Sequence, residues 1–287
     1  MSAPDQSTPA PIIFDRPLVA RRINAHPQKQ RDFVTQLVCD DLVDRLAPIA
    51  RKFEKALILG PNAQALPTTG KSGDHDIAFE RLSTLNAANS GPQELHLPQR
   101  KYDLIVSLLD LQVINDVPGY LARIRSHLAP DGLMLVAAVG GNSLAELRGA
   151  WLAADADHSG GAYARVAPFI DVRDAGSLLQ RTGFALPVTD IEQHIVRYKS
   201  PLALMRELKE LGATNPLADR PKNFVSKRLL GEACAHYEAL ASDPDKRIRA
   251  TLEILWMSGW APHESQQKPL QPGSAQVSLT KVLKTSN

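Results

Sequence analysis

The chain has 287 residues, of which 44% are hydrophobic and 22% are charged, and these values are ordinary for a soluble globular protein. The formal net charge of +2 gives no electrostatic basis for binding nucleic acid or an anionic membrane surface. Two cysteines, Cys39 and Cys234, are too few for a disulfide framework and have no metal-ligand spacing, so we expect a reducing, cytoplasmic environment and no metal site. No apolar run reaches the roughly 20 residues of a membrane-spanning helix, and the polar start of the chain lacks the features of a secretory signal.

The first hundred residues combine one helical pattern with short strand patterns. After Asp32, apolar residues up to Ile49 fall on one helical face, which Pro48 is expected to end or bend. The run Ala-Leu-Ile-Leu at 56–59 predicts a buried strand that leads into Gly60. We expect a second strand at 76–79, ending at Glu80, and a third strand near 83–85.

The stretch from 101 to 139 predicts one parallel crossover unit. Residues 104–106 form a buried central strand that ends at Ser107, and Asn115 or Asp116 caps the helix that follows, with Pro118 in its first turn. The turn Ala-Pro-Asp-Gly at 129–132 then leads into a buried strand at 133–139. Ligands of open α/β sheets bind at the carboxyl ends of strands, so the loop after Ser107 is the first candidate for a site.

The second half of the chain alternates helices with two late strands. Caps predict helices after Ser143, Asp171, Ser200 and Ser226, and the strand patterns lie at 184–198 and 251–256. The sequence therefore predicts an α/β fold with a Rossmann-like, doubly wound, mostly parallel sheet and a helical insertion before the last strand.

The same patterns divide the chain into five parts. We expect a disordered lead at 1–11, an N-terminal helical arm at 12–55, a Rossmann-like core at 56–199, a helical insertion at 200–249, and the last strand with a C-terminal segment at 250–287.

Position in this fold suggests a ligand site at two strand ends. Ser107 and Leu108 close the central strand, and Gly60 either contacts a ligand or forms a plain turn. Asn62 is a candidate donor to a ligand carboxylate or a surface turn residue. Asp110 is predicted to be an exposed loop residue or a cap. No Ser/His/Asp or Cys/His arrangement is visible, so no catalytic residue is assigned.

Several motifs resemble a known family. The strand that ends at Gly60, the Tyr-Asp-Leu-Ile-Val-Ser strand at 102–107 and the turn at 128–132 are similar to those of class I S-adenosylmethionine-dependent methyltransferases. Five flanking motifs resemble, more narrowly, the bacterial relatives of mitochondrial respiratory complex I assembly factor 5 and the malonyl-carrier-protein methyltransferase of biotin synthesis. These motifs lie at 14–16, 113–119, 165–169, 212–215 and 259–269.

The resemblance implies a class I methyltransferase fold with S-adenosylmethionine as cofactor. It implies a protein or carrier-protein substrate in a bacterial cytoplasm, with a respiratory complex I subunit as a candidate partner. The charge and the apolar runs described above indicate no nucleic acid and no stable membrane insertion. It places Gly60, Asn62, Ser107 and Leu108 at the cofactor, and Glu80 as the acid that closes the second strand and accepts the ribose hydroxyls. Contacts to substrate or partner fall on Arg165, Asn215, His263, Gln266, Gln267 and Lys268.

Alternatives remain for some of these residues. The segment around Trp260 and Pro262 either contacts a partner or forms a loop that clasps the domain through hydrogen bonds from the glutamines. Arg21 and Arg22 indicate a solvated helix face, or a helix that closes over the cofactor.

The sequence departs from the family on the cofactor side. The family's first loop resembles Gly-x-Gly-x-Gly, whereas this chain has Gly-Pro-Asn-Ala-Gln at 60–64, and Gln112-Val113 stand where His-Trp is usual. Pro61 has a fixed φ and no N–H, so it cannot act as the second glycine. Three hypotheses follow: a methyltransferase, a non-catalytic assembly module for a respiratory subunit, and a protein-arginine hydroxylase, which requires an oxidant and for which no iron ligand set is visible.

Overall fold

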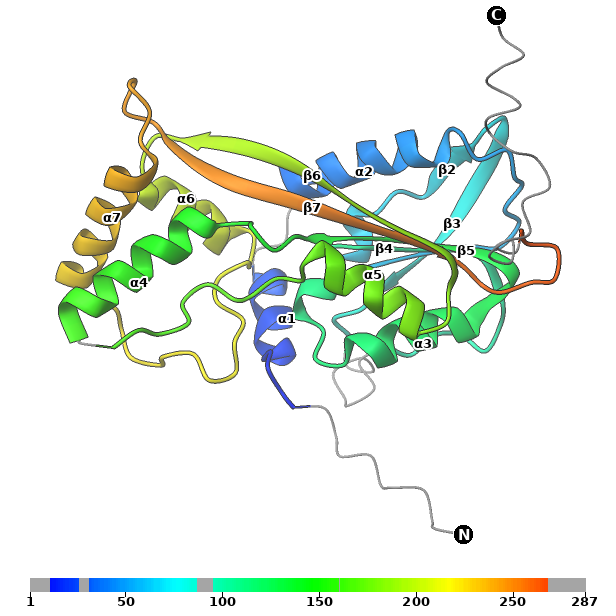
Figure 1. Cartoon of the computed structure of the whole chain (residues 1–287), viewed down its shortest axis with the longest axis horizontal. Helices are drawn as coiled ribbons and strands as arrows, with labels where there is room; N and C mark the ends of the chain where they lie inside the picture. Colours follow the sequence, from blue (N-terminus) through cyan, green and yellow to red (C-terminus); the bar gives the residue numbers. More distant parts are fainter. Residues whose placement is uncertain (1–10, 26–30, 87–94, 160, 268–287) are drawn as a thin grey trace, which may run out of the picture.

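A computed structural model describes residues 11–25, 31–86, 95–159 and 161–267, and its centre is a seven-stranded sheet with the order β2-β3-β1-β4-β5-β7-β6 (Figure 1). The pairs β3–β1, β1–β4 and β4–β5 are parallel, whereas β2 and β7 run antiparallel to their neighbours. This arrangement confirms the predicted α/β fold with a mostly parallel sheet. The strands are β1 (Ala56–Gly60), β2 (Thr69–Ser72), β3 (His75–Ser83), β4 (Tyr102–Leu108), β5 (Leu128–Val139), β6 (Ala185–Tyr198) and β7 (Ile248–Trp260).

The predicted crossover unit is confirmed at the middle of the sheet. β4 leads through α3 (Val117–His127) to β5, and Leu104 pairs in register with Leu133. Asp116 caps α3, since its carboxylate accepts a hydrogen bond from the N–H of Gly119. A side chain at residue 119 would collide with that carboxylate, so this capped turn requires glycine.

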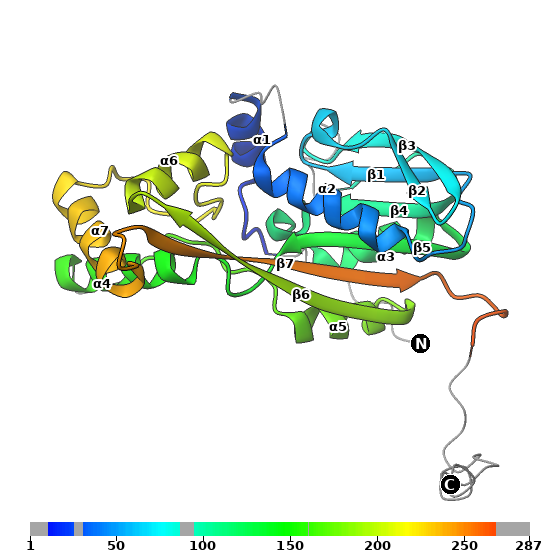
Figure 2. The same ribbon diagram turned by 90° about the horizontal axis from the view of Figure 1, so that it is seen from above.

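Helices cover both faces of the sheet (Figure 2). α3 and α5 (Val172–Arg181) bury Tyr120, Ile124 and Leu179 against one face. The opposite face packs against α2 (Phe33–Leu46), through Val38 and Leu42. Alternate residues of the central strands face these two layers, which is why β1 and the middle of β4, at 104–106, are continuously apolar rather than alternating.

A second, smaller core lies along the far part of the β6–β7 ribbon (Figure 1). The helical insertion before the last strand is confirmed as α6 (Pro201–Glu210) and α7 (Lys227–Ala241). α4 (Ala145–Ser159), which precedes the insertion in the chain, packs directly on α7. The short helix α1 (Arg16–Ala25) lies between this helical part and the sheet (Figure 2). The five-part division of the chain stays a prediction.

The region after β1 differs from the prediction. β2 and β3 form a hairpin joined by Gly73-Asp74, and Gly73 has φ of +53°, which such a tight turn favours in glycine. The expected third strand near 83–85 is wrong, because Ser83 is the last residue of β3 and Thr84 already belongs to a bend. Only a single 3-10 turn, η1 (Ala63–Ala65), follows β1, at the place where a doubly wound fold has a helix.

Candidate functional site

A cavity of about 600 Å³ lies at the carboxyl ends of β1, β4 and β5. Pro61, Asn62 and Leu66 line it from the loop after β1, and Leu108 lines it from the end of β4. α4 and α6 form its far wall, and α1 closes it through Val19, Arg22 and Ile23. Its volume falls within the range of ordinary small-molecule sites, roughly 300–1,000 Å³.

The two strand ends that the sequence analysis singled out are adjacent, since Leu59 pairs with Ser107. A Cβ on Gly60 would lie 2.9 Å from the Leu108 carbonyl oxygen and 3.2 Å from Leu66 Cδ2. Gly60 is therefore required by close packing and does not itself line the cavity. Leu66, which is 4% exposed, covers it and forms part of the cavity floor.

The loop after β1 uses most of its own N–H groups. Asn62 Oδ1 accepts from Gln64 N at 3.1 Å, while Ala65 N and Leu66 N donate to the carbonyls of Asn62 and Ala63. Pro61 has no N–H. Within the described residues, this leaves the N–H groups of Asn62 and Ala63 for a ligand. The loop thus offers a ligand fewer donors than a glycine-rich loop that opens a helix.

Ser107 points away from the cavity. Its Oγ lies 2.9 Å from the Tyr120 hydroxyl, inside a fully buried polar cluster. The expectation that Asp110 is exposed is wrong: its carboxylate is 0% exposed and lies 3.5 Å from Arg16 Nη1. Burial raises the pKa of Asp110 despite that guanidinium. Burial and the Asp110 charge raise the pKa of Tyr120 as well.

Glu80 does not occupy the position that its predicted role requires. It lies inside β3, opposite Leu57, where it accepts a hydrogen bond from the Tyr102 hydroxyl at 2.9 Å and forms an ion pair with Arg100. β3 continues to Ser83, whose hydroxyl donates to the Pro61 carbonyl. Glu80 therefore lies three residues before the end of β3 and contacts the start of β4 instead of closing the strand.

Arg165 and Asn215 both line the cavity, so two of the predicted substrate residues lie together. Arg165 Nε and Nη2 donate to the two carboxylate oxygens of buried Asp155, each at 2.7 Å, and its guanidinium lies over the Trp151 ring. Asn215 Nδ2 donates to the carbonyl of Ala164 at 2.7 Å.

The C-terminal residues of the same prediction lie beyond the other ends of the strands, away from the cavity. Gln266 Nε2 donates to Asp131 Oδ1 and to the Ala261 carbonyl, both at 2.8 Å, beside the start of β5. His263 is exposed and bonds to Ser265, and Gln267 is exposed. These residues lie apart from Arg165, and the alternative of a clasping loop describes Gln266. Lys268 lies outside the described residues.

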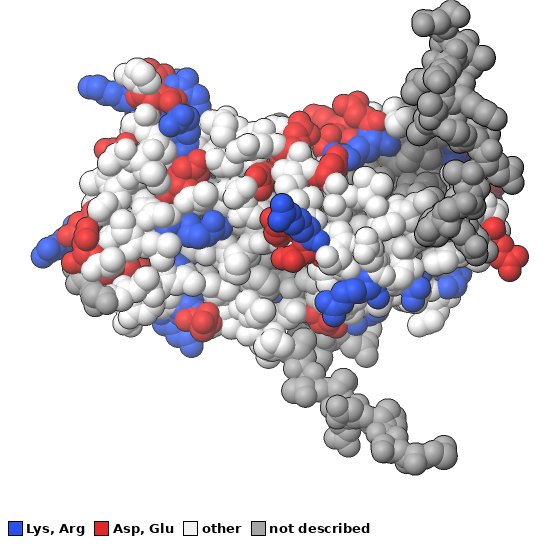
Figure 3. Space-filling model, viewed as in Figure 1, with Lys and Arg blue, Asp and Glu red and all other residues white. Residues whose placement is uncertain are grey.

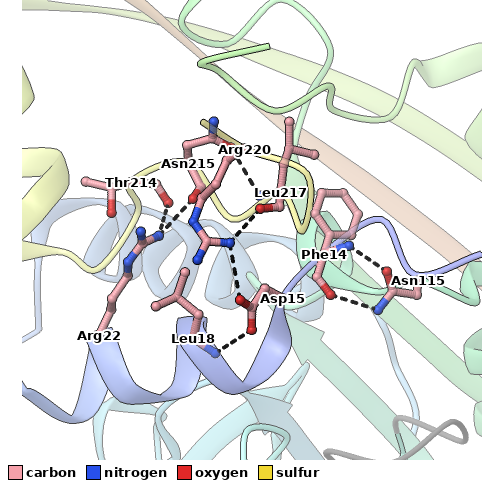
Figure 4. A network of polar contacts seen from close by, with 9 residues as sticks. All are labelled: Phe14, Asp15, Leu18, Arg22, Asn115, Thr214, Asn215, Leu217 and Arg220. Carbon is pink, nitrogen blue, oxygen red and sulfur yellow. Dashed lines mark hydrogen bonds and ion pairs between the residues drawn. The ribbon is translucent and has the colours of Figure 1, made fainter. Parts of the chain in front are cut away.

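A polar network that the sequence analysis missed attaches the N-terminal segment (Figure 4). Asn115 Oδ1 accepts from the N–H groups of Ile13 and Phe14, and Phe14 forms a β-bridge with Leu217 of the insertion. The reading of Arg22 as part of a solvated face is wrong, since Arg22 Nη1 donates to the carbonyls of Thr214 and Asn215. The residues of this network belong to the motifs at 14–16, 113–119 and 212–215. No local sequence pattern indicates that these three motifs contact one another.

Three further observations concern partners. On the face shown in Figure 3, basic and acidic side chains are interspersed. Among the described residues, no group of three or more His, Cys, Asp or Glu side chains is placed to hold a metal ion. Within the same ranges, every helix is too short or too polar to cross a bilayer.

Comparison with known proteins identifies the class. A family model described as a methyltransferase domain matches residues 31–215, which is more than half of the chain, so the chain belongs to the methyltransferase-domain family. Its relatives include arginine-hydroxylase NDUFAF5 of Homo sapiens, 33% identical over 96% of this chain and 84% of that protein. The malonyl-[acyl-carrier protein] O-methyltransferase of Halorhodospira halophila is 28% identical over 93% and 95% of the two chains. These relatives confirm the predicted resemblance.

One solved structure is of phosphoethanolamine N-methyltransferase 2 of Haemonchus contortus in complex with S-adenosyl-L-methionine. It matches with a TM-score of 0.39 and 14% identity, over 86% of this chain and 57% of that one.

Proposed function

We propose that this protein is an S-adenosylmethionine-dependent methyltransferase that acts on a protein or carrier-bound acceptor in the bacterial cytoplasm. The cavity at the ends of β1 and β4 carries the proposal, since it lies where ligands of open α/β sheets bind. The cofactor, when bound, supplies a methyl group on an already activated sulfonium. The protein then has to position the acceptor and exclude water rather than provide a covalent catalyst.

The residues present suit that limited task. Leu66 and Leu108 offer apolar surface to a nucleoside. The N–H groups of Asn62, which lines the cavity, and of the adjacent Ala63 are not used within the loop. Val19 and Ile23 of α1 shield the cavity from water. Arg165 and Asn215 shape the far wall through their own hydrogen bonds.

The relatives' names define the candidate acceptors. One relative is named for a malonyl group on an acyl carrier protein, and another is named an arginine-hydroxylase. By the sequence resemblance, the acceptors to test are a carrier protein and a subunit of respiratory complex I.

Isothermal titration of the full chain with S-adenosylmethionine tests cofactor binding. A tryptophan at Ala65, which lines the cavity, should lower the affinity by at least about tenfold because it fills the nucleoside end. A tryptophan at Gln64, which is exposed in the same turn, is the matched control and should leave the affinity unchanged. Absence of binding at millimolar cofactor would reject the methyltransferase proposal.

A second candidate function is a non-catalytic assembly module for a respiratory subunit. It is supported by Pro61, by the single turn η1 in place of a helix, and by Leu66 over Gly60. For this function we expect the tagged chain to retrieve a complex I subunit and to show no detectable cofactor binding. The Ala65→Trp variant should retrieve the subunit equally well. Labelled methyl transfer to the retrieved subunit would contradict it.

A third candidate, protein-arginine hydroxylation, rests on the name of the NDUFAF5 relatives. It predicts that an arginine of the retrieved partner gains one oxygen atom, which requires an added oxidant. Peptide mass spectrometry separates that product from a methylated one.

A further inference from the structure

The far end of the cavity is an apolar chamber, which we call the inner chamber. Its walls are Leu147 and Trp151 of α4, Val196 of β6, Met205 and Leu208 of α6, and Leu252 of β7. These side chains belong to four different elements, and none of them carries a charge. A space lined by such groups offers water few hydrogen-bond partners and favours apolar ligands.

The sequence of α6 produces one wall of this chamber. Leu204, Met205, Leu208 and Leu211 are spaced as one helical stripe, of the kind that normally packs against another element. All four side chains line the cavity. Leu204 is 2% exposed and is also part of the core with α7, whereas Met205 and Leu208 pack against that core and are only partly buried. Part of this apolar stripe therefore faces space that a ligand can fill.

Positive charge surrounds the same cavity. Arg22, Arg165 and Arg220 line it, while the carboxylates among its described lining residues are Asp32 and Glu210. Asp32 already caps α2, and Glu210 is exposed at the end of α6. Arg165 is held by Asp155, and Arg220 by Asp15. Among the described residues that line the cavity, no buried carboxylate is therefore available to pair with a cationic acceptor.

The guanidiniums of Arg22 and Arg220 also act on each other. Burial lowers the pKa of Arg22, and the charge of Arg220 lowers it further. A third cation in this space would add to that repulsion, whereas an anionic or neutral polar group would not. The chemistry of the wall therefore favours an uncharged chain with a neutral or anionic end.

We infer that the inner chamber binds an aliphatic chain, with its neutral or anionic end toward Arg22 and Arg220. This inference rests on the proposed function in one respect, namely that acceptor and cofactor share one cavity. It names the acceptor's class as lipid-like rather than guanidinium-like.

Titration with saturated fatty acids from hexanoate to dodecanoate, each below its micelle concentration, tests the inference on the full chain. Affinity should rise about three- to fourfold per added methylene until the chamber is filled. At equal chain length, the carboxylate and the alcohol should bind better than the primary amine, and N-acetyl-arginine amide should bind more weakly than any of the longer chains. Affinity that does not depend on chain length, or a preference for the amine, would overturn the inference.

Variants locate the site. Met205→Trp and Leu208→Trp, each filling the chamber from α6, should lower dodecanoate affinity at least about tenfold. Leu202→Trp is the matched control, because Leu202 is on the same helix, is exposed and does not line the cavity. If both chamber variants bind dodecanoate as the control does, the inference fails.

Two titrations separate this inference from the proposed function. Cofactor binding without chain binding refutes the inference alone. Chain binding without cofactor binding supports the inference and removes the methyltransferase proposal.

Discussion

The pair formed by Arg165 and Asp155 gives a quantitative test of whether Arg165 serves structure or substrate. Asp155 is 0% exposed, and both of its carboxylate oxygens accept from one guanidinium at 2.7 Å. The Arg165→Met substitution leaves that carboxylate buried without its counter-charge, which costs about 3–5 kcal/mol. Loss of the contact over the Trp151 ring, at 4.8 Å to the centroid, adds about 1 kcal/mol. This sum is a large part of a typical stability of about 5–15 kcal/mol.

The double variant Asp155→Asn/Arg165→Met should be more stable than Arg165→Met alone, because it removes the uncompensated charge. Urea unfolding of wild type, both single variants and the double variant, followed by circular dichroism at neutral pH, gives the coupling energy, which we expect to exceed about 2 kcal/mol. Additive effects, or a loss of less than about 1 kcal/mol for Arg165→Met, would refute the reasoning and return Arg165 to a role in substrate binding.

Three other substitutions test separate parts of the structure. Because burial raises the folded-state pKa of Asp110, its contribution to stability is full below the unfolded pKa and is lost as pH rises through the folded value. Asp110→Asn should therefore gain stability relative to wild type as pH rises from about 4 toward 7, and a constant difference in thermal unfolding would argue against this. Gln266→Ala should cost about 1 kcal/mol by releasing Asp131 and the Ala261 carbonyl, with unchanged cofactor titration; weaker cofactor binding would contradict its distance from the cavity. Gly60→Ala should cost about 1–3 kcal/mol, because its Cβ would lie 2.9 Å from the Leu108 carbonyl, and a thermally unchanged variant would disprove that contact.

The parts of the fold that local chemistry specifies were predictable from the sequence. The crossover from β4 to β5 carries its signals within a few residues: an apolar run, a cap at Asp116, Pro118 in the first turn and the turn before Gly132. The helices capped by Asp171, Ser200 and Ser226 were predictable for the same reason, since in each the cap accepts from an N–H two or three residues later.

The misplaced residues share a different property, since their partners are remote in the chain. Asp110 lies beside Arg16, and Glu80 accepts a hydrogen bond from the Tyr102 hydroxyl. Gln266 donates to Asp131, which is 135 positions earlier in the chain. No spacing rule links such pairs. The hairpin of β2 and β3 is an exception, because its Gly73-Asp74 turn was a local signal that the prediction did not use.

The loop after β1 also explains why the affinity for S-adenosylmethionine bears on the choice between catalysis and assembly. Hydrogen bonds to charged groups contribute about 1.5–3 kcal/mol each, and the loop after β1 spends the N–H groups of Gln64, Ala65 and Leu66 on its own turn. Each donor withheld from the cofactor's carboxylate therefore weakens binding by about ten- to a hundredfold. Apolar contact with Leu66 and Leu108 offsets part of that loss, by about 25 cal/mol per Å² buried. Micromolar binding of S-adenosylmethionine would show that this apolar contact and the two remaining donors suffice, whereas millimolar binding would leave the acceptor side as the part of the cavity that functions.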